Sequence, residues 1–290
     1  MTTGLVQWLP EGAFDVHLHS SPSLHKRIMN DFEVLEKAKR AGYAGLAIKA
    51  HEGSTVERAY LAAEHVGGIR CAGGIVLNDA VGGINPDAVE TALRLGGKFV
   101  WMPTLSAQCH KLHFSGGKDH SGICILDEKG GLVPEAHEVL RLVREHDAVL
   151  ATGHLSNAEI HVLINEALSV GVQKILVNHA DFDFLRLDLS EQADLARKGV
   201  FLEKCFLMTL PPWNFIDIGT MAEHIRVLGE ACCLLVTDLG QPENPDPIDG
   251  MGLFCAGLVA SGVSEKQCER MLCVNPQALI GSQPHAAGPS

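Results

Sequence analysis

Long hydrophobic runs are absent from this sequence. No apolar stretch approaches the ~18–20 residues of a membrane-spanning helix, and the N-terminus lacks the basic-then-apolar pattern of a signal peptide. The nine cysteines include no C-x-x-C pair, and Cys232 and Cys233 are adjacent within an apolar run, which indicates reduced, buried thiols. We therefore expect a cytoplasmic protein with no membrane partner.

An excess of basic charge is also absent. The chain has 23 Lys and Arg against 35 Asp and Glu, which gives a net charge of −12. Because phosphate backbones are bound by basic faces, this balance argues against nucleic acid as a partner. The first predicted strand is not followed by a Gly-rich dinucleotide fingerprint, which disfavours an open, doubly wound sheet.

Short apolar stretches alternate with predicted helices along the whole chain. Of the 290 residues, 46% are hydrophobic, so a large core is available. The alternation is typical of a parallel sheet buried on both faces, and a chain of this length suits a closed barrel, which typically takes about 250 residues. The sequence predicts the α/β class, with one (β/α)8 barrel over residues 1–281 and a disordered tail over 282–290. The predicted strands are 14–19, 44–51, 69–77, 98–104, 148–154, 174–179, 200–205 and 232–238.

Local signals place several helix starts and one long loop. Asp31 and Ser156 are suited to cap helices, and Pro86 is suited to the first turn of another. The longest irregular stretch, 105–133, follows the fourth predicted strand. Loops of this length are usually functional or mobile, so we expect this one to cover the mouth of the barrel.

Polar side chains stand at the ends of most of the predicted strands. His17 and His19 lie two apart in the first strand, so they share one face, about 7 Å apart along the strand, and can bind one metal ion. The active sites of such barrels lie at the carboxyl ends of the strands, so we expect all of these groups to converge on one metal site. The other strand-end residues are Lys49, His51, His154, His179, Glu203 and Asp238.

The order of these residues resembles the amidohydrolase superfamily of metal-dependent hydrolases, in a poorly characterised branch. The match consists of His17-Leu18-His19 on strand one, His154 on strand five, His179 on strand six and Asp238 on strand eight, with Asn275-Pro276 near the closing segment. The resemblance implies a (β/α)8 barrel and a divalent metal, Zn²⁺ first and Mn²⁺ as the alternative. It implies ligands from the set His17, His19, His154, His179, Asp238 and Glu203.

One departure from that superfamily concerns the fourth strand. Two-metal members carry a bridging Lys or Glu at its end, whereas this strand ends with residues 101–104, Trp-Met-Pro-Thr. We therefore expect one ion rather than two, unless Lys49 or Glu203 replaces the bridge. Glu203 is equally suited to a salt bridge with Lys204 or Lys49.

The resemblance implies metal-assisted attack of water on an amide, a lactone or a ring C–N bond of a small molecule. Asp238 would accept the proton, and His179 would polarise the substrate or complete the metal shell. The lysines and histidines near the site predict an anionic substrate, bound by Lys49, His51, His110 and His113 with help from Lys111 and Lys118. Two alternatives stay open: a mononuclear decarboxylase and, less favoured, a non-catalytic metabolite binder. The apolar segment 207–215 would line the pocket or form a contact in a homo-oligomer.

Overall fold

The computed structural model of the protein describes residues 8–185 and 187–281. Its strands pair in parallel in two sheets, β1-β2-β3 and β4-β5-β6-β7-β8-β9, in the order of the sequence. Helices separate consecutive strands as predicted, except for β3 and β4. The strands are β1 (Phe14–Leu18), β2 (Gly45–Ile48), β3 (Arg70–Ala72), β4 (Gly74–Val76), β5 (Phe99–Trp101), β6 (Val149–Ala151), β7 (Ile175–Val177), β8 (Phe201–Cys205) and β9 (Cys233–Val236).

The two sheets are continuous parts of one barrel. Only Gly73 separates β3, which pairs with β2, from β4, which pairs with β5, so the third predicted strand is split in two. At the outer edges, the Asp238 amide donates to the His17 carbonyl and the His19 amide donates to the Leu239 carbonyl, both at 2.8 Å. These bonds join the end of β9 to the end of β1, so the strands follow one another around a (β/α)8 barrel.

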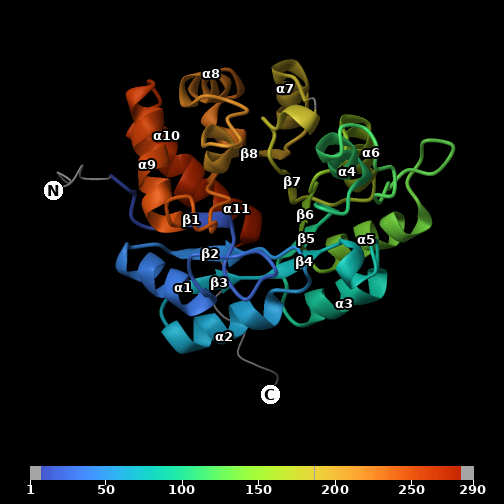
Figure 1. Cartoon of the computed structure of the whole chain (residues 1–290), viewed down its shortest axis with the longest axis horizontal. Helices are drawn as coiled ribbons and strands as arrows, with labels where there is room; N and C mark the ends of the chain where they lie inside the picture. Colours follow the sequence, from blue (N-terminus) through green and yellow to red (C-terminus); the bar gives the residue numbers. More distant parts are fainter. Residues whose placement is uncertain (1–7, 186, 282–290) are drawn as a thin grey trace.

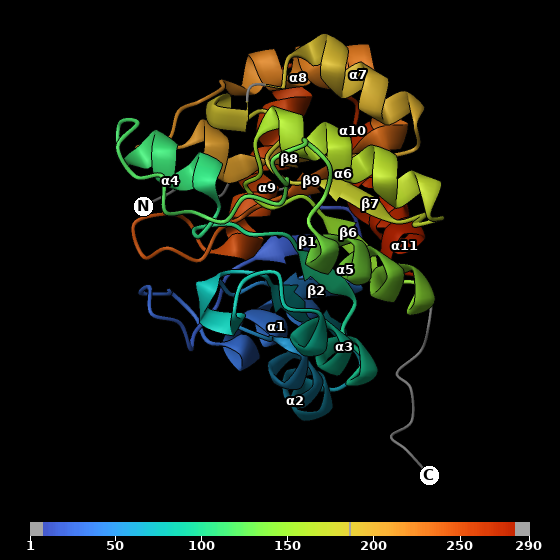
Figure 2. The ribbon, with the colours of Figure 1, turned by 90° about the vertical axis from the view of Figure 1, so that its right-hand side faces the viewer.

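Helices surround the strands (Figures 1 and 2). Helices α1, α2 and α3 lie on one side of the molecule and α7 and α8 on the opposite side. None of the described helices combines the length and the apolar composition that crossing a bilayer requires. The main helices are α1 (Asp31–Arg40), α2 (Val56–Val66), α3 (Pro86–Arg94), α4 (Gln108–Phe114), α5 (Pro134–Glu145), α6 (Asn157–Ser169), α7 (Leu189–Arg197), α8 (Ile218–Leu228), α9 (Pro247–Ala260), α10 (Glu265–Glu269) and α11 (Asn275–Ile280).

The predicted helix starts are confirmed in two cases and wrong in a third. Ser156 caps α6 in a capping box, and Pro86 occupies the first turn of α3. The cap of α1 is Asn30, one residue before the predicted Asp31, because the Asn30 side chain accepts from the Glu33 amide. The stretch 105–133, expected to be irregular, contains the short helix α4. The predicted tail, 282–290, lies outside the described residues.

Strand β8 sends neighbouring charged side chains to opposite faces. Alternation along a strand puts Glu203 toward the centre and Lys204 toward the surrounding helices, so the predicted salt bridge between them does not form. Lys204, which is fully buried, instead pairs with Asp181 at 2.9 Å and donates to Gln192 at 3.0 Å. His224 contacts the same Asp181 carboxylate at 2.9 Å. This buried network fastens β8 to the helices outside the barrel.

The network predicts a loss of stability in acid. Burial acts to raise the pKa of Asp181, but Lys204 and His224 outweigh it and lower the pKa to about 2. The folded pKa therefore lies below the unfolded value of 3.8, so this stabilisation is complete above pH 4 and is lost as the pH falls toward 2. We expect it to amount to about 2 kcal/mol. Urea unfolding between pH 5 and 2 measures this loss of stability. The Asp181→Asn variant should lose less stability over the same range. If the variant shows the same pH dependence as the wild type, Asp181 is not the cause of the loss.

Candidate active site

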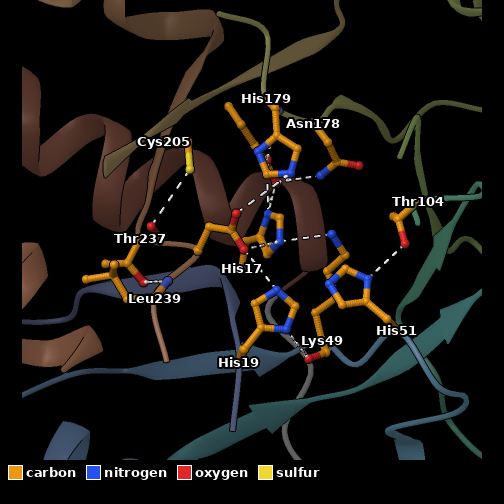
Figure 3. A network of polar contacts seen from close by, with 12 residues as sticks. His17, His19, Lys49, His51, Thr104, Asn178, His179, Cys205, Thr237 and Leu239 are labelled. Atoms are coloured by element: carbon orange, nitrogen blue, oxygen red, sulfur yellow. Dashed lines mark hydrogen bonds and ion pairs between the residues drawn. The ribbon is translucent and has the colours of Figure 1, made fainter. Parts of the chain in front are cut away.

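Two imidazoles and one carboxylate meet at the centre of the barrel mouth. His17 and His19, at the end of β1, place their Nε2 atoms 3.1 and 2.9 Å from the same Asp238 Oδ1 (Figure 3). All three residues are buried, and one potential ligand atom from each lies within 4.8 Å of the others. The structure therefore brings together these three residues, which the sequence predicts to converge on one site.

The other nitrogen of each imidazole is tied to the protein. His17 Nδ1 contacts the Glu203 carboxylate at 3.1 and 3.2 Å, and His19 Nδ1 contacts the Lys49 carbonyl at 2.8 Å. Asn178 donates to Glu203 at 2.7 Å and so fixes this carboxylate in turn. Carboxylates and carbonyls bound to Nδ1 are the usual partners that aim Nε2 at a metal ion. The geometry therefore gives Glu203 an orienting position behind His17.

The contact between Glu203 and His17 leads to a prediction for metal affinity. Glu203→Gln removes the charge that holds the His17 ring, so we expect zinc affinity to fall about 10–100-fold. Competition with a chromogenic chelator measures this, with Glu243→Gln as a matched control because Glu243 lies at the cavity and loses the same charge. Equal affinities in the two variants would contradict an orienting role.

His154 and His179 complete the ring of imidazoles. Their ring centroids are 5.2 Å apart, and that of His179 is 5.0 Å from His17. His154 Nε2 and His179 Nδ1 are buried and have no hydrogen-bond partner in the described residues, whereas His154 Nδ1 contacts His110 Nδ1 at 2.9 Å. Buried polar atoms without partners are rare in folded proteins, so these two nitrogens point to a ligand.

The backbone is strained where two of these side chains leave their strands. His179 and Asp238 have positive φ angles of 50° and 53°. Such angles are uncommon outside glycine and cluster at functional sites. Gly153 precedes His154 with a φ of 60°, and a Cβ there would lie 2.3 Å from the Met102 carbonyl oxygen. The turns that aim these residues inward therefore depend on special backbone conformations.

Burial and mutual charge set the protonation of the site. Burial lowers the pKa of His19 to about 3 and that of His179 to about 4, so both rings are neutral at pH 7, the form that binds metals. Burial and Lys49 act to lower the pKa of His17, but Glu203 and Asp238 outweigh them and raise it to about 9. A metal ion at His17 Nε2 therefore has to displace a proton. Burial acts to raise the pKa of Asp238, but His17 and His19 outweigh it and hold this pKa well below its usual value.

The end of β5 carries no bridging carboxylate or lysine, as the sequence indicates. Thr104 stands there and its hydroxyl contacts His51 Nδ1 at 2.8 Å. Lys49 reaches the centre from β2 instead, with Nζ 3.0 Å from His17 Nε2 (Figure 3). Burial lowers the pKa of Lys49, although Asp238 and Glu203 act in the opposite direction.

A cavity of about 650 Å³ opens above these residues. Lys49, His51 and His110 line it, as predicted for substrate-binding residues. His113 does not: it points to Asp183 at 3.9 Å and packs on Phe184. The predicted anion-binding Lys111 is also outside, 3.4 Å from Asp79, because helix α4 turns His110 inward and its neighbours outward. Lys118 is exposed.

Other residues that line the cavity include some that the sequence indicates and some that it does not. Leu207, Met208 and Trp213, from the apolar segment 207–215, line the cavity, one of the two roles expected for this segment. Arg27 lines it from the β1–α1 loop, and Phe182 from the loop after β7. No periodicity marks residues in such loops. Asn178, by contrast, stands at a strand end and could have been found by the same reasoning as His179.

The sequence model of one protein family, described as a family of unknown function (DUF6282), matches residues 12–203. This stretch covers more than half of the chain and includes most of the site. The chain belongs to DUF6282. No curated protein matches the sequence.

Solved structures resemble this DUF6282 chain over nearly its whole length. An amidohydrolase from Pseudomonas aeruginosa has a TM-score of 0.64 at 13% identity, covering 93% of this chain and 95% of that one. An organophosphorus hydrolase from Deinococcus radiodurans has 0.62 at 14% identity, covering 93% and 92%. ATU3138 from Agrobacterium tumefaciens has 0.58 at 13% identity, covering 95% and 98%. These matches confirm the amidohydrolase-like (β/α)8 fold predicted from the sequence.

Proposed function

We propose that this protein is a metal-dependent hydrolase that cleaves an amide, lactone or ring C–N bond of a small anionic metabolite. The observation that carries the proposal is the convergence of His17 Nε2 and His19 Nε2 on Asp238 Oδ1, with each Nδ1 tied behind. The fold shared with an amidohydrolase and an organophosphorus hydrolase supports it.

The residues present fit one divalent ion. His17, His19 and Asp238 supply two imidazole nitrogens and a carboxylate oxygen, a donor set that suits Zn²⁺, with Mn²⁺ as the alternative. His154 Nε2 and His179 Nδ1, which form no hydrogen bond within the described residues, are available to complete the shell or to bind substrate, and Glu203 Oε2 lies 4.0 Å from His179 Nδ1. Such an ion supplies a Lewis acid that activates water and polarises a carbonyl group.

The protein's own groups then have defined tasks. Asp238 is ionised because its pKa is held low, and its carboxylate accepts the proton of the attacking water. The water oxygen bonds to the carbonyl carbon, the C–N or C–O bond breaks, and Asp238 returns the proton to the leaving nitrogen or oxygen. His179, neutral at pH 7, donates a hydrogen bond to the carbonyl oxygen as negative charge develops there.

Lys49, His51 and His110 contribute the surrounding polar contacts. Lys49 is the most buried of the three and lies nearest the reacting centre, where its amine offers a hydrogen bond to the substrate. Its position also makes it the candidate for a bridge between two ions, in place of the group that β5 lacks.

A mononuclear decarboxylase is the second candidate. The observation that favours it is the end of β5, where Thr104 bonds to His51 and no bridging group stands. The two reactions differ in their products, because a decarboxylase releases CO2 and incorporates no oxygen from water.

Turnover in ¹⁸O-labelled water tests the proposal. Zinc-loaded and manganese-loaded protein is incubated with a panel of carboxylate-bearing amides, lactones and cyclic ureides, and the products are analysed by mass spectrometry. We expect one ¹⁸O atom in the acyl product and its loss in Asp238→Asn. CO2 release without label would identify the decarboxylase, and binding without turnover would identify a metabolite binder.

A further inference from the structure

Arg27 is a cation at the cavity that forms no hydrogen bond or ion pair with the described residues. It stands in the loop between β1 and α1, and its side chain lines the cavity. Its Nε is buried and has no hydrogen-bond partner in the described residues. A buried donor left unpaired is costly, and for a guanidinium, which always carries its charge, the cost is larger. An anionic group of a ligand would satisfy it.

The loop holds Arg27 in place on both sides. The amide of Ile28, the next residue, donates to the Gly240 carbonyl at 2.8 Å, and the Ser21 amide donates to the Met29 carbonyl at 2.9 Å. Asp238, Glu52 and Glu243 are acidic groups close enough to influence the charge of Arg27. However, Glu52 Oε1 accepts from the Ser23 hydroxyl and the Leu24 amide, at 2.7 and 2.8 Å, so Glu52 is bonded to the backbone and side chain of the β1–α1 loop rather than to the Arg27 guanidinium. Arg27 is therefore positioned before a ligand arrives.

Another part of the cavity lining is aromatic. Phe114, Phe182 and Trp213 line the cavity from the segments after β5, β7 and β8, whereas Arg27 comes from the segment after β1. The Trp213 ring centroid lies 6.0 Å from that of Phe114 and 6.2 Å from that of Phe182. Phe182 also lies 5.6 Å from the His179 ring, so this wall begins beside the candidate reacting centre.

The charge of the cavity differs from that of the chain. Lys26, Arg27 and Lys49 line it against two acidic residues, Asp238 and Glu243, whereas the chain has 23 basic and 35 acidic residues. A cavity lined by cationic side chains, by an aromatic cluster and by Asp238 favours a ligand that combines an anionic group with a flat apolar group.

We propose that Arg27 binds a carboxylate of the substrate while the wall of Phe114, Phe182 and Trp213 holds a flat apolar group at its other end. The substrate class is thus an aromatic or similarly flat apolar carboxylate, with the bond to be cleaved between the two ends. This inference rests on the proposed function, because only an enzyme has a substrate. The binding of an aromatic carboxylate can nevertheless be measured without turnover.

Ligand binding by NMR titration of the full chain tests it, with the metal-loaded and the chelator-treated protein in parallel. The probes are 3-phenylpropionate, its neutral amide and propionate. We expect Arg27→Met to weaken 3-phenylpropionate binding at least tenfold in both preparations and to leave the amide unchanged. Lys26→Met, a matched control that removes the same charge from an exposed neighbour, should weaken it less than threefold. Trp213→Leu should weaken 3-phenylpropionate but not propionate.

Two results would overturn the proposal. If Arg27→Met and Lys26→Met weaken binding equally, Arg27 acts only through the overall positive charge of the cavity and does not bind the carboxylate directly. If the acid and the amide bind equally well, no cation contributes to binding the carboxylate. Thermal unfolding gives a further check: Arg27→Met should not lower Tm, whereas a structural pair with Glu52 would make it do so. Because these readouts are independent of catalysis, a failed ¹⁸O experiment with the expected binding pattern would reject the hydrolase alone.

Discussion

Asp238→Asn is expected to lower turnover by about 10²–10⁴-fold, the usual contribution of a positioned general base. The amide cannot accept the proton of the attacking water. Asn is also the substitution that best preserves the structure, because it has the same shape as Asp and tolerates the positive φ of 53° found at this position. The loss should therefore appear in kcat of the folded protein, measured with the substrate found in the ¹⁸O screen.

Glu243→Gln is the matched control for this experiment. Glu243 lines the same cavity, and its replacement removes an equal charge, but it is not in contact with His17 or His19. Its kcat should stay within about threefold of the wild type. Near-normal turnover of Asp238→Asn with metal still bound would eliminate Asp238 as the proton acceptor.

Lys204→Met should destabilise the protein by about 3–5 kcal/mol, the cost of leaving a buried charge unpaired. Both Lys204 and its partner Asp181 are almost completely buried, and the variant leaves Asp181 with His224 as its one cationic partner among the described residues. Urea unfolding at pH 7 measures the change in the free energy of unfolding. The control is Lys198→Met, on an exposed lysine that donates to Asn165, where a change within about 0.5 kcal/mol is expected.

A second variant separates the lost charge pair from lost packing. Lys204→Met combined with Asp181→Leu removes both charges from the buried network, so it should recover part of the stability lost in the single variant. A single variant that loses less than 1 kcal/mol, or a double variant that loses the sum of both single effects, would contradict the account of a buried ion pair.

The sequence sufficed to predict the barrel and the centre of the site because both follow from simple periodicities. Eight apolar stretches alternating with helices predict the fold, and residues two apart in a strand share a face, which puts His17 and His19 together. The carboxyl ends of parallel strands meet at one end of a barrel, which brings Asp238 and His179 to the same place. No further information was needed for these residues.

The parts that were wrong or missed depend on contacts that no periodicity carries. The salt bridge considered between Glu203 and Lys204 ignores the alternation that separates them across the sheet. Among the three histidines of the loop 105–133, only the orientation of helix α4 shows that His110 faces the cavity while His113 faces away. Arg27 and Phe182 stand in irregular segments, so their approach to the cavity follows from the folded chain alone.

The metal content of the protein tests the central claim most directly. Protein purified without chelator or a His-tag column is analysed by elemental mass spectrometry, together with a variant in which His17 and His19 are both replaced by Asn. We predict about one equivalent of zinc or manganese per chain and its loss in the variant. Two equivalents of metal per chain would still support a metal centre, but with two ions instead of one. Lys49 would then be the candidate for the residue that bridges the two ions. No metal in the purified protein, with no rebinding of zinc or manganese, would contradict the account.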